Sequence, residues 1–199
     1  MERLVCLAAG YLCGCFLTAE IVAHYRTGQG AASLGTGNPG TANVVGQLGI
    51  GWGALVLLGD VGKTALALAL CRFWLAPGLG MVGGLYAGLG AVLGHNFPVW
   101  RRFRGGKGVA VTCAAIVLVS PLWGAVSCLA GLAAVLLSGY LLLGAVLIPC
   151  LFIIPAFAVH GVEPGILSAV LAILMVIRHI HGLERIASHT EKKFGQRRT

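Results

Sequence analysis

Residues 140–159 read YLLLGAVLIPCLFIIPAFAV, a run of twenty residues without one charged side chain. About 20 apolar residues are enough to cross a bilayer as a helix, so this stretch predicts a transmembrane helix. The whole chain has the same character, because 58% of its 199 residues are hydrophobic and only 10% are charged. A soluble domain has about a quarter of its residues charged. The composition therefore predicts an all-α, polytopic integral membrane protein. It excludes a membrane-anchored soluble enzyme, a nucleic-acid-binding protein and a disordered protein, since each needs a long polar stretch.

Apolar stretches bounded by glycine, proline or charge predict a single membrane-embedded domain, 1–199, with about seven spans. These spans are 3–24, 44–75, 79–96, 108–119, 121–138, 140–159 and 165–180. The second is either one kinked helix or two shorter ones, and it contains Asp60 and Lys63, which are spaced to meet on one helix face. Seven cysteines lie in apolar runs without CxxC spacing or histidine partners, so we expect neither a disulfide framework nor a metal site.

Basic residues are concentrated in two places, and this predicts the orientation of the chain. They are Arg101, Arg102, Arg104 and Lys107 in one loop, and Arg178, Arg185, Lys192, Lys193, Arg197 and Arg198 toward the C-terminus. Loops rich in lysine and arginine stay on the cytoplasmic side of a membrane. With seven spans, the N-terminus is then outside, and the segments 25–43, 97–107 and 178–199 all face the cytoplasm.

The first of these segments contains the glycine-rich loop 34–43, LGTGNPGTAN. Such a backbone can turn its N–H groups inward, as anion-binding loops do. An ordinary Gly/Asn/Pro turn between helices explains the same residues equally well.

The second segment, 94–109, reads GHNFPVWRRFRGGKGV and is more specific. Its Gly-Gly-Lys-Gly sequence opens an apolar helix, so backbone donors, the positive helix end and an ammonium group are expected to point at one anion. The spacing is not that of a Walker A loop. Anchoring by a basic loop explains the arginines, but it explains neither the glycines around Lys107 nor His95 at the membrane edge.

The third segment, 178–191, reads RHIHGLERIASHTE. Arg178 and His179 emerge at the cytoplasmic boundary, where a histidine can bind a polar substrate or move a proton. Side chains that reach for lipid head groups are the alternative explanation. The positions of His95 and His179 at the same membrane edge suggest a shared site.

Taken together, the three segments resemble those of the PlsY family of bacterial acyl-phosphate glycerol-3-phosphate acyltransferases. The middle segment matches the family pattern most closely, through Gly94-His95, Phe97-Pro98, Phe103 and Gly105-Gly106-Lys107-Gly108-Val109. The resemblance implies a seven-helix enzyme of the bacterial inner membrane whose active site faces the cytoplasm. It also implies transfer of a fatty acyl group from acyl phosphate to the 1-hydroxyl of glycerol 3-phosphate, giving lysophosphatidic acid. No metal, other cofactor or acyl-CoA is expected, and the expected partners are these two substrates and membrane lipid, with the protein a monomer.

The resemblance also assigns roles to residues of the three segments. It makes Thr36, Lys107 and His179 the expected catalytic residues. The expected substrate-binding residues are Gly35, Gly37, Asn38, Gly40, Asn43, His95, Arg104, Gly105, Gly106, Gly108, Arg178, Arg185 and Glu191.

Some positions depart from the family pattern. Gly46 replaces an arginine, Gly182 replaces an asparagine, Thr36 replaces a serine, and residues 14–17 read Gly-Cys-Phe-Leu in place of a Gly-Ser-Ile-Pro turn. Losing two contacts to charged groups weakens glycerol 3-phosphate binding by about 10²-fold or more.

Two alternatives therefore stay open: a related enzyme with a different acceptor, and a lipid-binding paralogue without turnover. A transporter or channel is disfavoured, because most polar groups lie at one membrane edge rather than along a midplane pathway.

Overall fold

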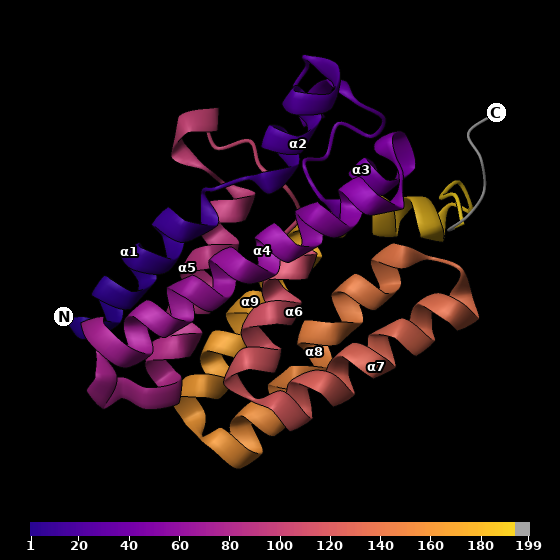
Figure 1. The fold of residues 1–199 in the computed structure, drawn as a ribbon. Helices are drawn as coiled ribbons and strands as arrows, with labels where there is room; N and C mark the ends of the chain where they lie inside the picture. Colours follow the sequence, from indigo (N-terminus) through magenta and orange to yellow (C-terminus); the bar gives the residue numbers. More distant parts are fainter. Residues whose placement is uncertain (194–199) are drawn as a thin grey trace. The chain divides into compact units, whose positions relative to one another are not determined.

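The computed structural model describes residues 1–193, which form helices joined by short turns (Figure 1). Arg197 and Arg198 of the predicted basic tail lie outside the described residues. The α-helices of the described part are α1 (Glu2–Gly14), α2 (Thr18–Thr27), α3 (Thr41–Leu48), α4 (Ile50–Leu70), α5 (Gly80–Asn96), α6 (Val109–Val119), α7 (Pro121–Ser138), α8 (Leu141–His160) and α9 (Val162–Ala187). Residues 1–193 contain no β-strand, so the all-α prediction is confirmed.

Within this range, six helical segments are long and apolar enough to cross a membrane. They are Glu2–Thr27, Ile50–Leu75, Pro77–Arg101, Pro121–Ser138, Leu141–His160 and Val162–Ala187. The polytopic membrane protein predicted from composition is thus confirmed. The remaining predicted span, 108–119, corresponds to α6, which has 11 residues, whereas a full crossing takes about 20. The count of seven crossings and their orientation stay predictions.

The predicted span 44–75 consists of two helices, α3 and α4, which meet at Gly49. This residue has φ 95° and ψ 170°, a conformation that glycine adopts far more readily than residues with a Cβ. It ends one helix and begins the next, so the chain changes direction there. After α4 the backbone continues through one π-helical turn, Cys71–Leu75.

The predicted span 3–24 is also interrupted, because α1 and α2 are separated by a short non-helical segment. Leu17 in this segment is extended, with φ −103° and ψ 94°. The neighbouring carbonyl of Phe16 accepts a hydrogen bond from Lys63 Nζ at 2.7 Å. A side chain from α4 therefore satisfies a backbone group left without a helical partner at the break. The turn forms even though its sequence lacks the proline of the family pattern.

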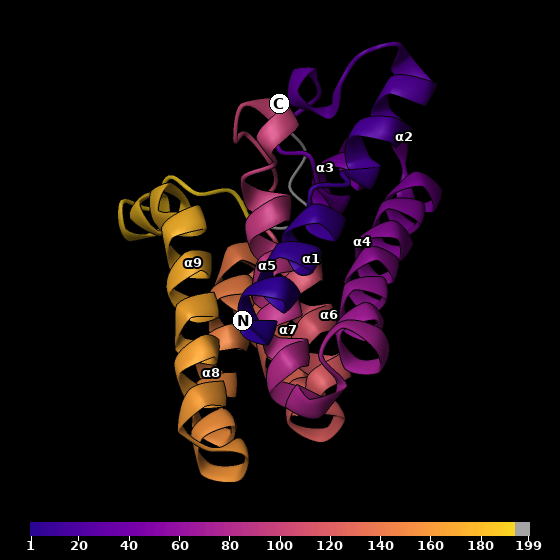
Figure 2. The ribbon, with the colours of Figure 1, turned by 90° about the vertical axis from the view of Figure 1, so that its left-hand side faces the viewer.

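The chain divides into two compact units, 1–118 and the part from 119 onward. In the first unit, α1 and α5 lie side by side, as both ribbon views show (Figures 1 and 2). A Cβ on Gly14 would lie 2.7 Å from the Cα of Ala91, and one on Gly94 would lie 2.8 Å from the backbone nitrogen of Cys15. Glycine at these positions lets the two backbones approach closely, as in many membrane helix pairs. The end of α5 is thereby held against the break between α1 and α2.

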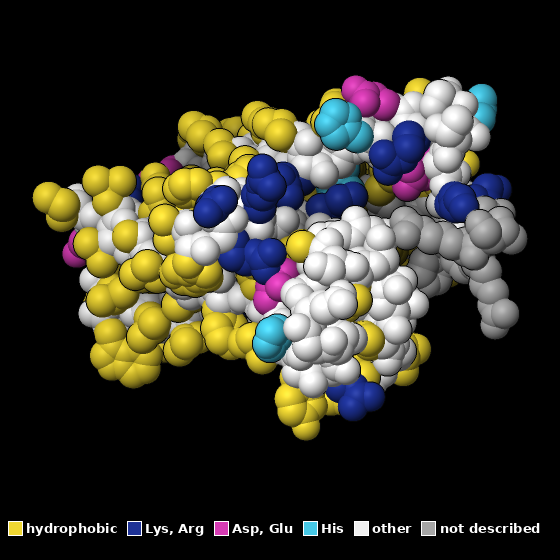
Figure 3. Space-filling model, turned by 90° about the horizontal axis from the view of Figure 1, so that it is seen from above, with side chains coloured by type: hydrophobic (Ala, Val, Ile, Leu, Met, Phe, Trp, Pro, Cys, Tyr) yellow, Lys and Arg dark blue, Asp and Glu magenta, His cyan; other side chains and the backbone are white. Residues whose placement is uncertain are grey.

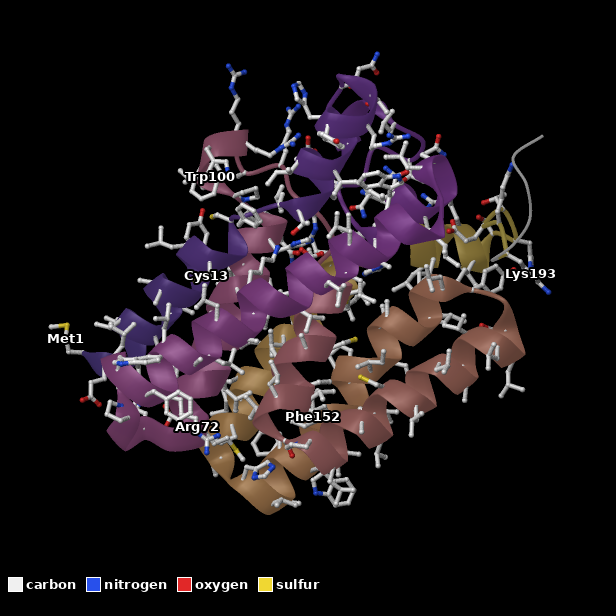
Figure 4. All side chains as sticks on the ribbon, viewed as in Figure 1. Met1, Cys13, Arg72, Trp100, Phe152 and Lys193 are labelled. Atoms are coloured by element: carbon white, nitrogen blue, oxygen red, sulfur yellow. The ribbon has the colours of Figure 1, made fainter. Side chains whose placement is uncertain are left out.

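In the second unit, α7 packs against α8, and α8 packs against α9. A Cβ on Gly144 of α8 would lie 2.5 Å from the carbonyl oxygen of Gly131 on α7, so small residues again set the helix separation. Phe152, labelled on α8 in Figure 4, is 1% exposed.

Candidate active site

Asn43, in the first turn of α3, holds the shape of the glycine-rich loop before it. The side chain is buried, at 6% exposure. Its Oδ1 accepts a hydrogen bond from the Thr36 N–H at 2.9 Å, and its Nδ2 donates to the carbonyl oxygens of Leu34 at 3.0 Å and Ala31 at 3.4 Å. Asn43 therefore organises the loop through contacts inside the protein.

Five further predicted residues shape this loop. Gly35 and Gly37 have φ of 53° and 72°, in the left-handed region that favours glycine. Thr36 lies between them and is exposed, and its hydroxyl oxygen accepts a hydrogen bond from the N–H of the half-buried Asn38 at 3.4 Å. Gly40 is the extended residue directly before α3. The Thr36 hydroxyl is thus presented at the surface of an ordered turn.

The second loop reverses direction at Arg102 and Phe103. These residues have φ of 51° and 60°, a conformation that costs free energy when a Cβ is present. Lys107 follows in the same loop and is half-buried. Helix α6 begins at Val109, directly after the Gly-Gly-Lys-Gly sequence, as predicted.

Backbone hydrogen bonds fasten this loop to the end of α5. The N–H of Gly105 donates to the carbonyl oxygen of Asn96 at 3.1 Å, and the N–H of Gly106 donates to that of His95 at 3.0 Å. These two amides are thus engaged within the protein. Lys107 directly follows these two fastened glycines in the chain.

The two loops meet at Gly106. A Cβ on this residue would collide with Nε2 of His95 and would lie 2.9 Å from the carbonyl oxygen of Pro39 in the first loop. A Cβ on Gly108, whose φ is 78°, would lie 2.6 Å from Oδ1 of Asn96. Gly106 and Gly108 are therefore needed because a Cβ at either position would be too close to its neighbours. A role of this loop in membrane anchoring through its basic residues would not require them.

A surface cleft of about 520 Å³ lies between these loops in the first unit. It is lined by Ala32, Gly37, Pro39, Trp100, Arg101, Arg102, Arg104 and Gly105. Figure 3, which looks down on this end of the molecule, shows lysine and arginine side chains gathered there, and Figure 4 labels Trp100. Arg104, a predicted binding residue, is exposed at this cleft. The guanidinium groups of Arg102 and Arg104, beside two glycine-rich turns, suit an anionic ligand.

Glu20 on α2, a residue not predicted from the sequence, links the two loops. Its carboxylate accepts a hydrogen bond from the Ala31 N–H at 3.1 Å and forms an ion pair with Arg101. The available signal was an acidic residue inside a long apolar stretch, which is costly unless the residue has a partner.

Behind the loops, His95 belongs to a buried polar cluster with Asp60 and Lys63. The exposed fractions are 3% for His95, 2% for Asp60 and 7% for Lys63. Lys63 Nζ lies 2.7 Å from Asp60 Oδ1 and 2.9 Å from His95 Nδ1. The predicted pairing of Asp60 with Lys63 on one helix face is confirmed, and His95 extends it toward the second loop.

The third motif lies in the second unit, at the end of α9. His179 is buried, at 3% exposure, and its Nδ1 lies 2.9 Å from the carbonyl oxygen of Met175. A carbonyl only accepts hydrogen bonds, so Nδ1 carries the proton and the neutral ring has its lone pair on Nε2. That nitrogen has the chemistry of a base. Arg178, beside it in sequence, is half-buried.

Arg185 and Glu191 close the turn that follows α9. The Arg185 Nε donates to Glu191 Oε2 at 2.5 Å, and the Glu191 N–H donates to the Arg185 carbonyl at 3.0 Å. Gly182 is buried in the same helix, and a Cβ there would lie 2.8 Å from Leu142 Cδ2. An asparagine at position 182 would therefore require Leu142 to move.

Gly46, the other departure from the family pattern, has a different environment. It lies on α3, is exposed, and a Cβ added to it would meet nothing within 4 Å. A Cβ therefore fits at position 46 without any shift of its neighbours.

A family model described as "Glycerol-3-phosphate acyltransferase" matches residues 4–189 of the chain. A glycerol-3-phosphate acyltransferase of Thermoanaerobacter sp. (strain X514) is 33% identical over 188 residues, covering 94% of this chain and 93% of the relative. The glycerol-3-phosphate acyltransferase 1 of Lactobacillus acidophilus is 38% identical over 186 residues, covering 89% and 85%.

The solved structures that resemble this chain are also of a glycerol-3-phosphate acyltransferase. The crystal structure of PlsY, an integral membrane glycerol 3-phosphate acyltransferase, in its glycerol 3-phosphate form has a TM-score of 0.87 and 28% identity, and covers 98% of this chain and 96% of PlsY. The lysophosphatidic acid form of PlsY has a TM-score of 0.85 with the same identity and coverage. The sequence match over nearly the whole length and the shared membrane fold lead to one conclusion: this chain belongs to the PlsY family of glycerol-3-phosphate acyltransferases.

Proposed function

We propose that this glycerol-3-phosphate acyltransferase takes its fatty acyl group from acyl phosphate and passes it to the 1-hydroxyl of glycerol 3-phosphate. The product is lysophosphatidic acid. The main support is the arginine-lined cleft at which the two glycine-rich loops of the first unit meet, since both substrates carry a phosphate. PlsY itself has been crystallised in a glycerol 3-phosphate form and a lysophosphatidic acid form.

In the proposed reaction, the hydroxyl oxygen of the acceptor attacks the carbonyl carbon of the donor. A new C–O ester bond forms, the bond between the acyl carbon and the phosphate oxygen breaks, and inorganic phosphate leaves with the electron pair. Lys107 and Arg104 hold phosphate groups, and the loop around Thr36 stabilises the negative charge that develops on the carbonyl oxygen. Acyl phosphate is already activated, so no covalent acyl-enzyme is needed.

His179 is the proposed base for the acceptor hydroxyl. Its Nδ1–H donates to the Met175 carbonyl, so in the neutral ring Nε2 is the basic nitrogen. The departing phosphate is a second possible acceptor of the same proton.

For location, we propose a monomer in the bacterial inner membrane, built as one domain with seven crossings, the N-terminus outside and the active site facing the cytoplasm. The basic residues of the second loop support this orientation. It is tested by placing single cysteines at Arg104 and Glu163 in a chain whose native cysteines are replaced. In intact cells, an impermeant maleimide should label position 163 and not position 104, and the reverse pattern would contradict the orientation.

Gly46 and Gly182 support a second candidate, a PlsY-like transferase with a different acceptor. Neither glycine offers a side-chain donor where the family pattern has an arginine and an asparagine. At position 182, a Cβ would lie 2.8 Å from Leu142 Cδ2 and 3.7 Å from Arg185 Nη2, so an asparagine there would require Leu142 to move.

One assay separates these possibilities. Purified protein in lipid vesicles is given radiolabelled glycerol 3-phosphate with either palmitoyl phosphate or palmitoyl-CoA, and the lipid product is quantified. The proposal predicts labelled lysophosphatidic acid with palmitoyl phosphate and none with palmitoyl-CoA. Product from a panel of other hydroxyl or amine acceptors, but not from glycerol 3-phosphate, would favour the second candidate. No product from any acceptor would indicate a lipid-binding paralogue.

A further inference from the structure

A charged cluster lies in the interior of the first unit, at positions the proposed reaction does not use. Asp60 and Lys63 are on α4, one helical turn apart, and both are more than nine-tenths buried. Charges inside a membrane-spanning helix are costly unless they are paired and hydrogen-bonded. Their contacts therefore indicate what the pair does.

The Lys63 ammonium has three N–H donors and three acceptors around it. It lies 2.7 Å from Asp60 Oδ1, 2.7 Å from the carbonyl oxygen of Phe16 and 2.9 Å from His95 Nδ1. The Phe16 carbonyl is available because the helix is broken between α1 and α2. The cluster thus joins this break, α4 and the end of α5.

This arrangement fixes the protonation of the His95 ring. An ammonium group donates and cannot accept, so His95 Nδ1 accepts the hydrogen bond from Lys63. In the neutral ring the proton then lies on Nε2. Asp60 Oδ1 lies 3.6 Å from His95 Nδ1, so the carboxylate also borders this edge of the ring.

The opposite edge of the His95 ring faces the junction of the two loops. A Cβ on Gly106 would collide with His95 Nε2 and would lie 3.0 Å from His95 Cδ2 and 2.9 Å from the Pro39 carbonyl oxygen. The His95 backbone also accepts the Gly106 N–H at 3.0 Å. The ring therefore supports the loop immediately before Lys107.

We propose that Asp60 and Lys63 are positioning residues for acyl transfer. The pair holds His95 as the Nε2–H tautomer beneath Gly106, and thereby fixes the place of Lys107 relative to the first loop. The expected effect on kcat rests on the proposed function, whereas the placement of the His95 ring by Asp60 and Lys63 does not.

The test uses the full-length double variant Asp60→Asn/Lys63→Met, which removes both charges and so leaves no single charge unpaired in the interior. A small displacement of a reacting group lowers turnover by roughly 10²-fold, and we expect a fall in kcat of that order. The KM for glycerol 3-phosphate should change much less. Thr64→Val is the matched control, because Thr64 is equally buried on α4 and its hydroxyl donates to the backbone carbonyl of Asp60 in the same helix. It should retain wild-type kcat.

A second measurement tests the protonation of His95 in the wild-type protein, and so depends neither on activity nor on the folding of the variant. In ¹⁵N-histidine-labelled wild-type protein, with the His95 signals assigned through His95→Gln, the ring should be protonated at Nε2. In the double variant, this single tautomer should be lost. Wild-type kcat in the folded double variant, or a wild-type His95 ring protonated at Nδ1, would overturn the inference. Absence of product from the wild-type protein would instead count against the proposed function, and the NMR result would still decide the positioning role.

Discussion

Replacing Gly46 by arginine should strengthen the binding of glycerol 3-phosphate. Position 46 is exposed on α3, three residues after Asn43, and a Cβ there meets nothing within 4 Å, so an arginine can extend from it toward a bound phosphate. A hydrogen bond to a charged group contributes about 1.5 to 3 kcal/mol. This corresponds to a decrease in KM of about 10- to 100-fold, with a smaller effect on kcat.

The control for this prediction is Gly46→Met. Both substitutions remove a helical glycine and should stabilise α3 by up to about 1 kcal/mol, but only arginine adds a charge. Initial rates are measured in vesicles over a range of glycerol 3-phosphate concentrations at saturating acyl phosphate. Equal KM values for Gly46→Arg and Gly46→Met would refute the reasoning, because they would show that no bound phosphate comes within reach of position 46.

Two further predictions concern the loops of the first unit. Asn43→Ala removes three hydrogen bonds that order the first loop, at about 1 kcal/mol each, so the thermal unfolding midpoint should fall, whereas the exposed neighbour Ala42→Ser should leave it unchanged. Gly106→Ala places a methyl group against the Pro39 carbonyl and should reduce kcat by roughly 10²-fold, whereas Gly51→Ala, in open space, should retain activity. Unchanged melting in the first variant, or unchanged turnover in the second, would show that these contacts do not order the loops.

Much of the fold follows from the sequence because hydrophobic length is a strong signal in membrane proteins. Runs such as 140–159 have no charged residue, and a helix satisfies all of its backbone groups within itself, so the all-α membrane fold is predictable. The helix breaks are harder to predict. The break before Leu17 depends on Lys63, 47 residues away from Phe16, which hydrogen-bonds the freed carbonyl.

The candidate site was likewise predictable from the sequence only in part. Glycine, lysine and histidine in the second segment indicate a phosphate site, and the structure explains the glycines by the close approach of His95 and Pro39 to Gly106. The ion pair of Glu20 with Arg101 was not predictable, because it joins residues 81 positions apart whose meeting depends on tertiary structure. The sequence also does not show where the Gly105 and Gly106 N–H groups point. In the structure they donate hydrogen bonds to backbone carbonyls at the end of α5.

The central claim is that the loop carrying Lys107 holds the phosphate during acyl transfer from acyl phosphate to glycerol 3-phosphate. The most direct measurement is the rate of lysophosphatidic acid formation by Lys107→Ala compared with Lys192→Ala, both reconstituted in the same vesicles. Lys192 is exposed in the tail, so this control changes the net charge equally. We predict that Lys192→Ala keeps wild-type activity and that Lys107→Ala forms no product. Full activity of Lys107→Ala would contradict the account.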